Sequence, residues 1–551
     1  MNYKNPILLC DYSDPDVVRV DDDFFLTASS FNFVPGLPIL HSRDLLHWRL
    51  VNYAAKSIPL SGYEKVRNAK GLWAPSIRFH DGKFYIFVAT PDEGIFFTSA
   101  ANPFGEWSEL QCVWSGRGFE DPCPLWETSA NGNERLFVVH AYVKSRIGFN
   151  SKLGLLELDP KNFTAISEDK IIFDGTKTQP TIEGPKFYKR NGFYYIFAPA
   201  GGVTNGWQTV LRSKRIDGGY EEKIVLAQGK ARTNGPHQGG WVTTPSGEDW
   251  FMHFQDSGIF GRIVHLQPMR WISDWPVMGN AVAFSDEKAL SIVGEPVEKW
   301  KMPRIKSKLE SPESPNMTEN VISPCAMTAL KSPSEFQFSA NPSERNFATT
   351  KNSLWLTPSV CTKKIDSKKF SYEKEFSLAG EWRENERRGI IFLGNEYAAL
   401  QIEKSGENEF TISYLESSGS ESGDEERSEN VIWSEKISRQ ARNDSLSQHD
   451  AFSRNDAKFV TSSEVEMSVQ PECIGGANLS AFATSGRDNR HSELTLGSIT
   501  LKMKFATTKD GKSGKVRFFV KGKIGGKKIS FKSKPFMTTN AHWVGGRFGW
   551  F

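Results

Sequence analysis

Residues 80–89 (HDGKFYIFVA) and 189–198 (KRNGFYYIFA) each place a short polar turn before a run of aromatic and β-branched residues. The same pattern recurs at 20–29 (VDDDFFLTAS), 130–140 (ANGNERLFVVH) and 245–254 (PSGEDWFMHF). The spacing is roughly 50 to 60 residues, enough for one four-stranded sheet with its loops, and no helical periodicity lies between the repeats. The pattern predicts an all-β fold, with a five-bladed β-propeller as the leading architecture and a pair of β-sandwiches as the alternative.

The residues upstream of each turn are expected to begin the innermost strand of a blade, at the central channel. They are Asp14 in YSDPDVV, Ser76 in GLWAPSIRF, Asp121 in GFEDPCPLW, Glu183 in PTIEGPKFY and His237 in NGPHQGGWV. A buried carboxylate is costly unless it is solvated or paired. Several ionisable side chains that converge on one axis therefore indicate a functional site.

The second half of the chain has a different character. Residues 1–300 are expected to form the propeller, and the Pro-, Ser- and charge-rich residues 301–334 a linker. Alternating segments within 335–551, such as RRGIIFLGNEYAALQIE and KVRFFVKGK, predict a second all-β domain, a β-sandwich. Within it, the polar, aperiodic residues 417–456 are expected to be a loop insertion.

Composition excludes several classes of protein. With 68 Lys and Arg against 65 Asp and Glu, the net charge is +3, so the whole chain shows no preference for nucleic acid or membrane. The 6 cysteines form no C-x-x-C pair, which argues against a disulfide framework or a cysteine metal cluster. No apolar run has signal-peptide or membrane-span length, so the expected location is cytoplasmic, or periplasmic or extracellular if a signal has been removed.

Three of the inward residues suit the hydrolysis of a glycosidic bond. That reaction needs a carboxylic acid on one side of the bond and a carboxylate on the other, about 5–5.5 Å apart for retention or about 6.5–9.5 Å for inversion. Glu183 precedes Gly-Pro, where glycine permits close approach of a substrate, and is the acid candidate. Asp14 is the partner candidate, and Asp121 is expected to raise the pKa of the acid. For both aspartates, a turn residue before proline is the alternative.

Four further residues are binding candidates, each with a structural alternative. His237 is a candidate ligand for a metal or a water, or a core histidine. Trp73 and Phe31 are candidates for a sugar-stacking platform, or for core packing. Arg262 is a candidate donor to sugar hydroxyls, or a surface ion-pair partner.

The segments SDPDVVRVDDDFFLTASSFNFVPG, GLWAPSIRFHDGKFYIF, EDPCPLW, TIEGPKFYKRNGFYYIFAPAGG and GPHQGGWV together resemble glycoside hydrolase family 43. FSANPSERNF and the terminal HWVGGRFGWF resemble the sandwich appended in β-xylosidase-like members. The resemblance implies a five-bladed propeller followed by a β-sandwich, and inverting hydrolysis of xylosides, arabinofuranosides or arabinans. It implies no required cofactor, although a structural calcium or a water is expected at the propeller centre.

Carried over by position, the resemblance makes Asp14 the general base, Glu183 the general acid and Asp121 the residue that modulates the acid and orients substrate. It implies that His237 lies beside the calcium or water, that Arg262 contacts the sugar, and that Trp73 and Phe31 line the pocket. One position departs from the family pattern. Many relatives have Asp after Trp-Ala-Pro where this chain has Ser76, and Asp92 is the candidate to supply the missing charge.

The expected function is therefore an exo-acting, inverting glycoside hydrolase that releases a pentose from non-reducing ends of xylan or arabinoxylan oligosaccharides. β-Xylosidase is favoured over α-L-arabinofuranosidase, and no nucleic-acid or membrane partner is expected. The alternative is a carbohydrate-binding protein whose propeller has reduced or lost catalysis.

The stretch from Lys502 to Lys534, with eleven Lys and one Arg against one Asp, has its own alternatives. It suits nucleic acid, the solvent face and edges of a sandwich, or an acidic polysaccharide. The alternation of charged and apolar residues favours the solvent face.

Overall fold

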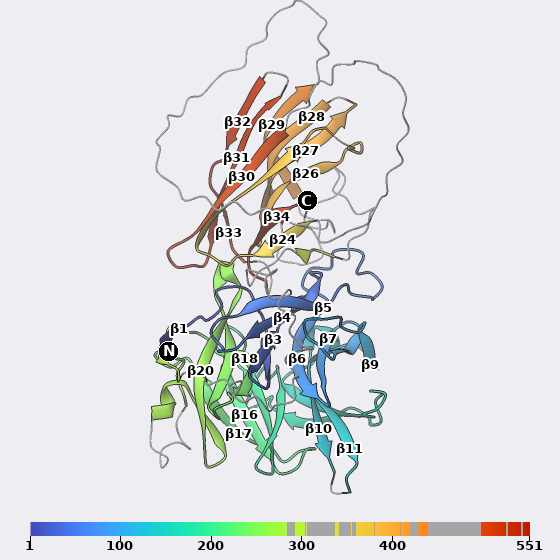
Figure 1. Ribbon diagram of the computed structural model, residues 1–551, viewed down its shortest axis with the longest axis vertical. Coiled ribbons are helices and arrows are strands. Elements are labelled where there is room, and N and C mark those ends of the chain that lie inside the picture. Colours follow the sequence, from blue (N-terminus) through green and yellow to red (C-terminus); the bar gives the residue numbers. More distant parts are fainter. Residues whose placement is uncertain are drawn as a thin grey trace, which may run out of the picture.

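The computed structural model describes residues 2–129, 131–283, 293–303, 305, 337–340, 354, 360–379, 381–407, 409–418, 428–438, 498–524, 527–540 and 544–551. Helical elements are short: α1 (Lys144–Ile147) and the 3-10 turns η1 (Gly258–Phe260) and η2 (Gly279–Ala283). The predicted all-β fold is confirmed. Figure 1 shows an N-terminal part, blue to green, below a C-terminal part, yellow to red. No helix in the described part of the chain is long and apolar enough to cross a membrane.

The N-terminal part contains five four-stranded antiparallel sheets, each built from strands consecutive in sequence. The five turns expected from sequence each join the first and second strand of one sheet. Sheet 1 holds β2 (Asp16–Val20), β3 (Asp23–Thr27), β4 (Gly36–Ser42) and β5 (Arg49–Ala55); sheet 2 holds β6 (Trp73–His80), β7 (Lys83–Thr90), β8 (Gly94–Ala100) and β9 (Gln111–Ser115). Sheet 3 holds β10 (Phe119–Thr128), β11 (Glu134–Tyr142), β12 (Lys152–Leu158) and β13 (Lys170–Asp174). Sheet 4 holds β14 (Lys186–Arg190), β15 (Phe193–Ala200), β16 (Trp207–Ser213) and β17 (Glu221–Ala227); sheet 5 holds β18 (His237–Thr243), β19 (Asp249–Asp256), β20 (Arg262–Ile272) and β21 (Trp275–Met278).

Apolar clusters join these sheets in a closed ring. Four clusters each lie between consecutive sheets, and a fifth packs Val17 and Leu26 of sheet 1 against Met252 and Val264 of sheet 5. Strands such as β3, β4 and β15 are buried along almost their whole length. Successive side chains point to opposite faces of a sheet, so both faces of these strands are packed against neighbouring sheets. The ring leaves the beginnings of the first strands, β2, β6, β10, β14 and β18, on one side of the molecule.

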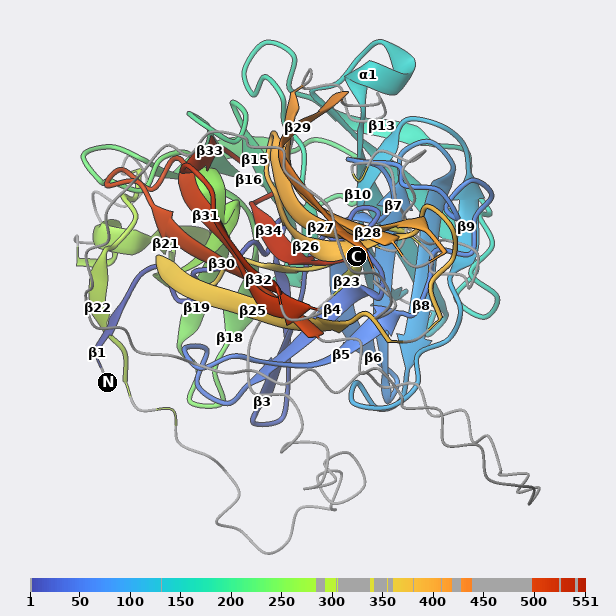
Figure 2. The same cartoon turned by 90° about the horizontal axis from the view of Figure 1, so that it is seen from above.

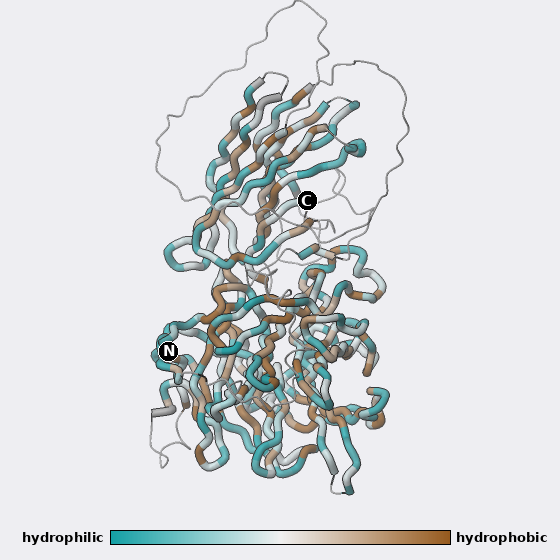
Figure 3. The backbone as a smooth tube through the Cα atoms, in the orientation of Figure 1, coloured by the Kyte–Doolittle hydropathy of each residue, from teal (hydrophilic) through white to brown (hydrophobic). Residues whose placement is uncertain are grey.

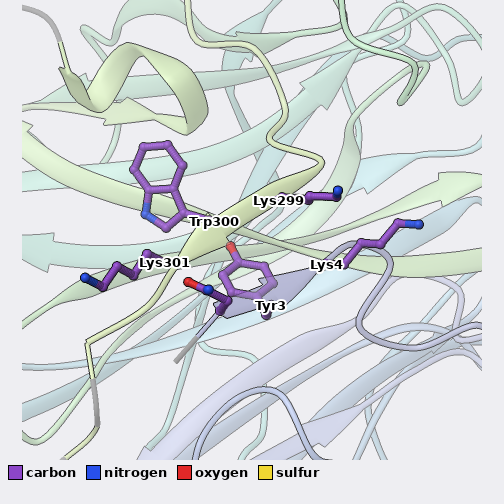
Figure 4. A pocket seen from close by; sticks show the side chains of 6 residues that line it. Tyr3, Lys4, Lys299, Trp300 and Lys301 are labelled. Carbon is purple, nitrogen blue, oxygen red and sulfur yellow. The ribbon is translucent and has the colours of Figure 1, made fainter.

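The N-terminal segment pairs with the segment that follows the five sheets. Strand β1 (Asn2–Lys4) pairs with β22 (Lys299–Lys301), and Leu8 forms a bridge with Val264 of sheet 5. A shallow pocket of about 550 Å³ lies on this strand pair (Figure 4). It is lined by Asn2, Tyr3, Lys4, Lys299, Trp300 and Lys301. Because none of these is a carboxylate, the pocket is unsuited to acid–base chemistry on a glycosidic bond.

The C-terminal part consists of two facing antiparallel sheets around one core. Its strands alternate hydrophilic and hydrophobic residues along much of their length (Figure 3). The seven-stranded sheet runs β23 (Gln337–Phe338), β24 (Cys361–Lys364), β34 (Arg547–Trp550), β26 (Arg387–Leu393), β27 (Tyr397–Gly406), β28 (Glu409–Ser418) and β29 (Ser428–Ser438). The five-stranded sheet contains β25 (Lys369–Ser377), β30 (Ser498–Thr507), β31 (Gly514–Ile524) and β32 (Lys527–Lys532), with β33 (Phe536–Thr538) paired to β31.

One sequence prediction for this part is wrong. Residues 428–438 were expected to belong to a loop insertion, but they form β29, which pairs with β28 along its whole length. Tyr414 opposes Trp433 across this pair, and Trp433 stacks on Phe531 of the facing sheet. A few apolar residues in a polar stretch were therefore enough to anchor a strand. Most of the expected linker, 301–334, lies outside the described residues.

The two parts touch at the side of the ring where the inner strands begin. The backbone N–H of Gly545 donates to Asp11 Oδ2 at 3.1 Å, and Val34 forms a bridge with Phe338. Val544 packs in an apolar cluster with Phe31 and Trp73. Seen from above, the strands of the C-terminal part lie over the ring (Figure 2). The C-terminal part therefore covers part of the face where the candidate site residues lie.

Candidate active site

The beginnings of the inner strands share one short pattern that the structure makes visible. In each sheet, a residue with positive φ precedes proline or glycine at or near the start of the innermost strand. The left-handed residues are Asp14, Ala74, Asp121, Gly184 and Gln238. The residues before them are Ser13, Trp73, Glu120, Glu183 and His237, and those two positions after them are Asp16, Ser76, Cys123, Lys186 and Gly240. Register shifts in β6, β10 and β18 fall on this pattern, as expected where a bulge redirects a side chain.

Asp14 is held by donors on both carboxylate oxygens. Ser13 and Ser29 each donate a hydroxyl hydrogen bond of 2.6 Å to Oδ2. Arg262 Nη1 lies 3.3 Å from Oδ1 and also donates to Ser13 Oγ at 2.6 Å. The φ of +56° at Asp14 is unusual outside glycine and is found at functional positions. These contacts fix the orientation of one carboxylate and bring Arg262, predicted to bind sugar, directly to it.

Glu183 contacts His237, its neighbour in the ring. His237 Nε2 and Glu183 Oε1 are 2.8 Å apart, and the imidazole is buried whereas the Glu183 side chain remains 30% exposed. Gly184 follows with φ +60°, and a Cβ there would lie 2.6 Å from Gln238 Cδ. Glycine at position 184 therefore avoids a clash with Gln238 and suits the left-handed backbone. It leaves an oriented carboxyl group open to a substrate.

Asp121 is close enough to both Asp14 and Glu183 for their charges to affect its pKa. Its Oδ2 accepts a 2.6 Å hydrogen bond from the backbone N–H of Gly184, which ties sheet 3 to sheet 4 beside Glu183. Burial, together with the negative charges of Glu183 and Asp14, raises the pKa of Asp121 to about 8. Asp14, Asp121 and Glu183 therefore meet in one site, as the sequence predicted.

Glu120 is a fourth carboxyl group in this site, and sequence reasoning missed it. Burial and the charges of Asp121, Glu183 and Asp14 raise its pKa well above the usual range, and Arg146 opposes that rise. The signal was present in the sequence, since Glu120 precedes Asp-Pro as Glu183 precedes Gly-Pro. Arg146 lies within α1, and the sequence offered no comparable signal for it.

Ser76 does not occupy the ring position that sequence analysis gave it. The left-handed residue of sheet 2 is Ala74, and Ser76 belongs with Asp16, Cys123 and Lys186. There its hydroxyl accepts a 2.8 Å hydrogen bond from the buried Lys186 Nζ, which also donates to Pro75 O at 3.0 Å. The error arose because the repeat was aligned on its turns, whereas bulges change the count of residues between turn and site.

Asp92 does not stand free to replace a carboxylate at position 76. It lies 3.2 Å from Arg146, 3.6 Å from Arg117 and 3.8 Å from Arg67. Its charge is therefore shared among three guanidinium groups that flank the site. The charged group beside Ser76 is instead Lys186. Lys186 lowers the pKa of Asp121, but the rise caused by burial is larger.

Phe31 and Trp73 form a wall beside the carboxyl groups. Their rings meet edge to face with centroids 6.3 Å apart, and the guanidinium of Arg146 lies 5.5 Å from the Trp73 ring. Phe31 is 4% exposed and Trp73 is 7% exposed, with Val544 of the C-terminal part packed in the same cluster. The two aromatic rings therefore shape an enclosed wall and leave little open surface for stacking.

A calcium ion beside His237 does not fit the described donors. Calcium takes about six to eight oxygen ligands, and an imidazole nitrogen is a poor member of such a set. Among the residues that the structure describes, no group of three or more His, Cys, Asp or Glu could hold a metal ion. His237 Nδ1 is buried without a hydrogen-bond partner in the described part. A single imidazole nitrogen does not make a calcium site.

The raised pKa of Asp121 predicts a pH-dependent effect of Asp121→Asn on stability. The pKa of Asp121 is about 8 in the folded protein and 3.8, its ordinary value, in the unfolded chain. At pH values between these two, the folded protein holds a proton that the unfolded chain has released, so native stability falls as pH rises through this range. Asparagine cannot titrate and can still accept from Gly184. We expect the melting temperature of the variant, relative to wild type, to be a few degrees higher at pH 8 than at pH 5. Calorimetry across this range measures the difference.

The control for that measurement is Asp81→Asn, at the exposed turn between β6 and β7. Its melting temperature relative to wild type should not change with pH. If the melting temperature of Asp121→Asn relative to wild type is also independent of pH, the raised pKa of Asp121 is contradicted.

A closed ring of antiparallel sheets that brings several carboxyl groups together is an arrangement that acid–base hydrolysis of a glycosidic bond can use. Residues 3–276 match the family model described as Glycosyl hydrolases family 43, and this part of the chain belongs to that family.

Curated relatives agree with this assignment. The chain is 41% identical over 302 residues to a putative beta-xylosidase of Xylanibacter ruminicola, covering 55% of this chain and 54% of the relative. It is 31% identical over 299 residues to a non-reducing end alpha-L-arabinofuranosidase of Bacteroides ovatus, covering 50% of this chain and 54% of the relative. The chain thus spans about half the length of the curated relatives it matches.

Solved structures share the fold over nearly the whole chain. A xylan beta-1,4-xylosidase from Bacillus halodurans C-125 superposes with a TM-score of 0.65 at 19% identity, covering 99% of this chain and 96% of that one. A GH43 glycoside hydrolase engineered for endo-xylanase and exo-arabinofuranosidase activity gives 0.67 at 18% identity, covering 100% and 96%. At this identity the likeness concerns the fold alone.

Proposed function

We propose that the protein is an exo-acting, inverting glycoside hydrolase that releases a pentose from non-reducing ends of xylan or arabinoxylan fragments, with β-D-xylose favoured over α-L-arabinofuranose. The observation that carries this proposal is the meeting of Asp14, Asp121 and Glu183 at the beginnings of three inner strands. Residues 1–300 would act as a five-bladed propeller, 301–334 as a linker and 335–551 as a β-sandwich. The five cyclically packed four-stranded sheets and the two facing sheets support this division.

Asp14 is the proposed general base. An inverting hydrolase activates a water on the face of the sugar opposite the leaving group, so the base must be rigidly oriented. Hydrogen bonds from Ser13 and Ser29, with Arg262 beside the other oxygen, supply that orientation. Arg262 also has donors to offer to a sugar hydroxyl near the reacting carbon.

Glu183 is the proposed general acid. The Glu183 side chain is 30% exposed, whereas that of Asp14 is 9% exposed. The greater exposure suits an acid that must reach the glycosidic oxygen of a substrate. The hydrogen bond with His237 orients it. The negative charge of Glu183 contributes to the raised pKa of the neighbouring Asp121. No step of this mechanism passes through a metal ion.

An exo mode of action is supported by the enclosure of the site. Phe31, Trp73 and Val544 form a buried apolar wall at one side, and Val544 comes from the C-terminal part. A wall of this kind accommodates a chain end more readily than an extended polymer. The names of the matched relatives, beta-xylosidase and non-reducing end alpha-L-arabinofuranosidase, support a pentose at that end.

A panel of substrates tests this proposal. We expect release of nitrophenol from nitrophenyl β-xyloside or α-L-arabinofuranoside, and of one monosaccharide at a time from xylooligosaccharides. Proton NMR of the first-formed sugar should show the anomer opposite to that of the substrate. A retained anomer would refute the mechanism, and tight oligosaccharide binding without product would favour the alternative of a carbohydrate-binding protein.

A further inference from the structure

The outer face of the five-stranded sheet carries a continuous field of positive charge. Direct cross-strand pairs place Lys502 opposite Phe519, Lys504 opposite Arg517, and Phe519 opposite Lys532. Residues directly opposite share a face, so the alternate residues along each strand belong to the same surface. This basic face consists of Lys502, Lys504, Lys515, Arg517, Lys521, Lys528 and Lys532 around Phe519.

The opposite face of the same strands explains why these side chains point outward. Leu501, Met503, Val516, Phe518 and Val520 are buried in the core between the two sheets. Five of the seven cations, Lys515, Arg517, Lys521, Lys528 and Lys532, are exposed, and the other two are half-buried. The fold therefore requires polar residues on this face, but it does not require them to be cations.

The need for a polar outer face does not explain why so many of its residues are cations, for two reasons. Lys504 and Arg517 are directly opposite each other, and like charges in that relation destabilise a sheet. Lysines that guard a sheet against aggregation belong on its edge strands. Most of the basic face instead lies on β30 and β31, which have neighbours on both sides. Within the described face, carboxylates come only from β25, where Glu373 pairs with Lys502 at 3.4 Å.

We propose that this basic face binds an anionic polysaccharide that carries carboxylate groups, such as a xylan with uronic-acid side groups. The choice of a polysaccharide rests on the proposed function, because an enzyme that trims pentose chain ends gains effective concentration from a second contact with the same polymer. Alternate residues along a strand are about 6.6 Å apart, so the face offers repeated cations to spaced carboxylates.

The residue types favour this partner over a nucleic acid. This face has six Lys and one Arg, so its positive charge is mostly that of flexible point cations, which suit carboxylates spaced along a polymer. Single-stranded nucleic acid needs several aromatic rings for stacked bases. The one ring here, Phe519, is half-buried, and Lys504 and Lys532 lie 5.5 and 6.0 Å from its centroid.

The test compares binding of two polymers to three proteins. The polymers are a xylan with glucuronic-acid side groups and the same xylan after reduction of its carboxyl groups. The proteins are wild type, the variant Lys504→Gln/Arg517→Gln/Lys521→Gln/Lys532→Gln, and a control with the same change of charge on exposed lysines of the ring, Lys83→Gln/Lys161→Gln/Lys177→Gln/Lys230→Gln. Affinity electrophoresis or calorimetry at low salt measures binding.

We expect wild type and control to bind the acidic xylan at least about tenfold more tightly than the reduced one, and the basic-face variant to lose about tenfold in affinity, since four modest ion pairs are removed. Added salt should weaken the binding. Equal binding of both polymers, equal loss in the control, or tighter binding of single-stranded DNA or anionic vesicles would overturn the proposal.

Hydrolysis of a nitrophenyl glycoside separates this proposal from the proposed function. All three proteins should turn over this small substrate at the same rate, because none of the changed side chains has a hydrogen bond or ion pair with the carboxyl groups of the site in the described part of the chain. Absence of turnover in all three, with selective binding of acidic xylan intact, would refute the proposed function and leave the basic face standing.

Discussion

Replacing Asp14 with asparagine is expected to lower kcat/KM by about a thousandfold or more on every substrate of the enzyme. Asparagine has nearly the same shape and can still accept from Ser13 and Ser29, so the fold should persist. It cannot take a proton from the attacking water. Because water attack is required for every leaving group, the loss should be similar for nitrophenyl glycosides and for xylobiose. Initial rates on both substrates measure the effect.

The matched control for this change is Asp81→Asn, at the far end of an inner strand. It should keep wild-type rates, and circular dichroism should show the same strand content in all proteins. An Asp14→Asn enzyme that stays within about tenfold of wild type would rule out a general base at this position.

Replacing Glu183 with glutamine is expected to have an effect that depends on the leaving group. The amide keeps an acceptor for His237 but offers no acidic proton to the glycosidic oxygen. Nitrophenolate leaves without protonation far more readily than a sugar alkoxide does. We therefore expect kcat/KM to fall by about a hundredfold to ten-thousandfold on xylobiose and by much less on nitrophenyl xyloside.

Glu221→Gln, on the outermost strand of the same sheet, is the control, since Glu221 forms an exposed ion pair with Arg212. It should leave both rates unchanged. If Glu183→Gln loses the same factor on both substrates, Glu183 serves another role, and the acid has to be sought among its neighbours, with Glu120 the first candidate.

The sequence alone was sufficient for the all-β fold class, and it pointed to several of the residues that the structure brings together. A turn followed by an aromatic or β-branched strand is a local signal, because the turn depends on its own residues and the strand on its own alternation. Repetition of that signal at even intervals predicted sheets of equal size. The same repeat led to Asp14, Asp121, Glu183 and His237, which the structure brings together from four different sheets.

What the sequence left open depended on contacts between distant segments. The bulges that align Ala74 with Asp14, and Ser76 with Lys186, follow from the register of paired strands, and no single strand encodes its partner's register. The strand β29 forms because Trp433 meets Phe531 from the other sheet. The pairing of Asp92 with three arginines and the arrival of Val544 beside Trp73 are likewise tertiary.

The sequence by itself determined that the chain forms repeated antiparallel sheets and that carboxyl groups begin three of the inner strands, because strand propensity and turn chemistry act over a few neighbouring residues. Only the tertiary structure decided the electrostatics of those groups. A pKa such as that of Asp121 depends on burial and on charges contributed by other sheets, which come within reach only when the ring closes.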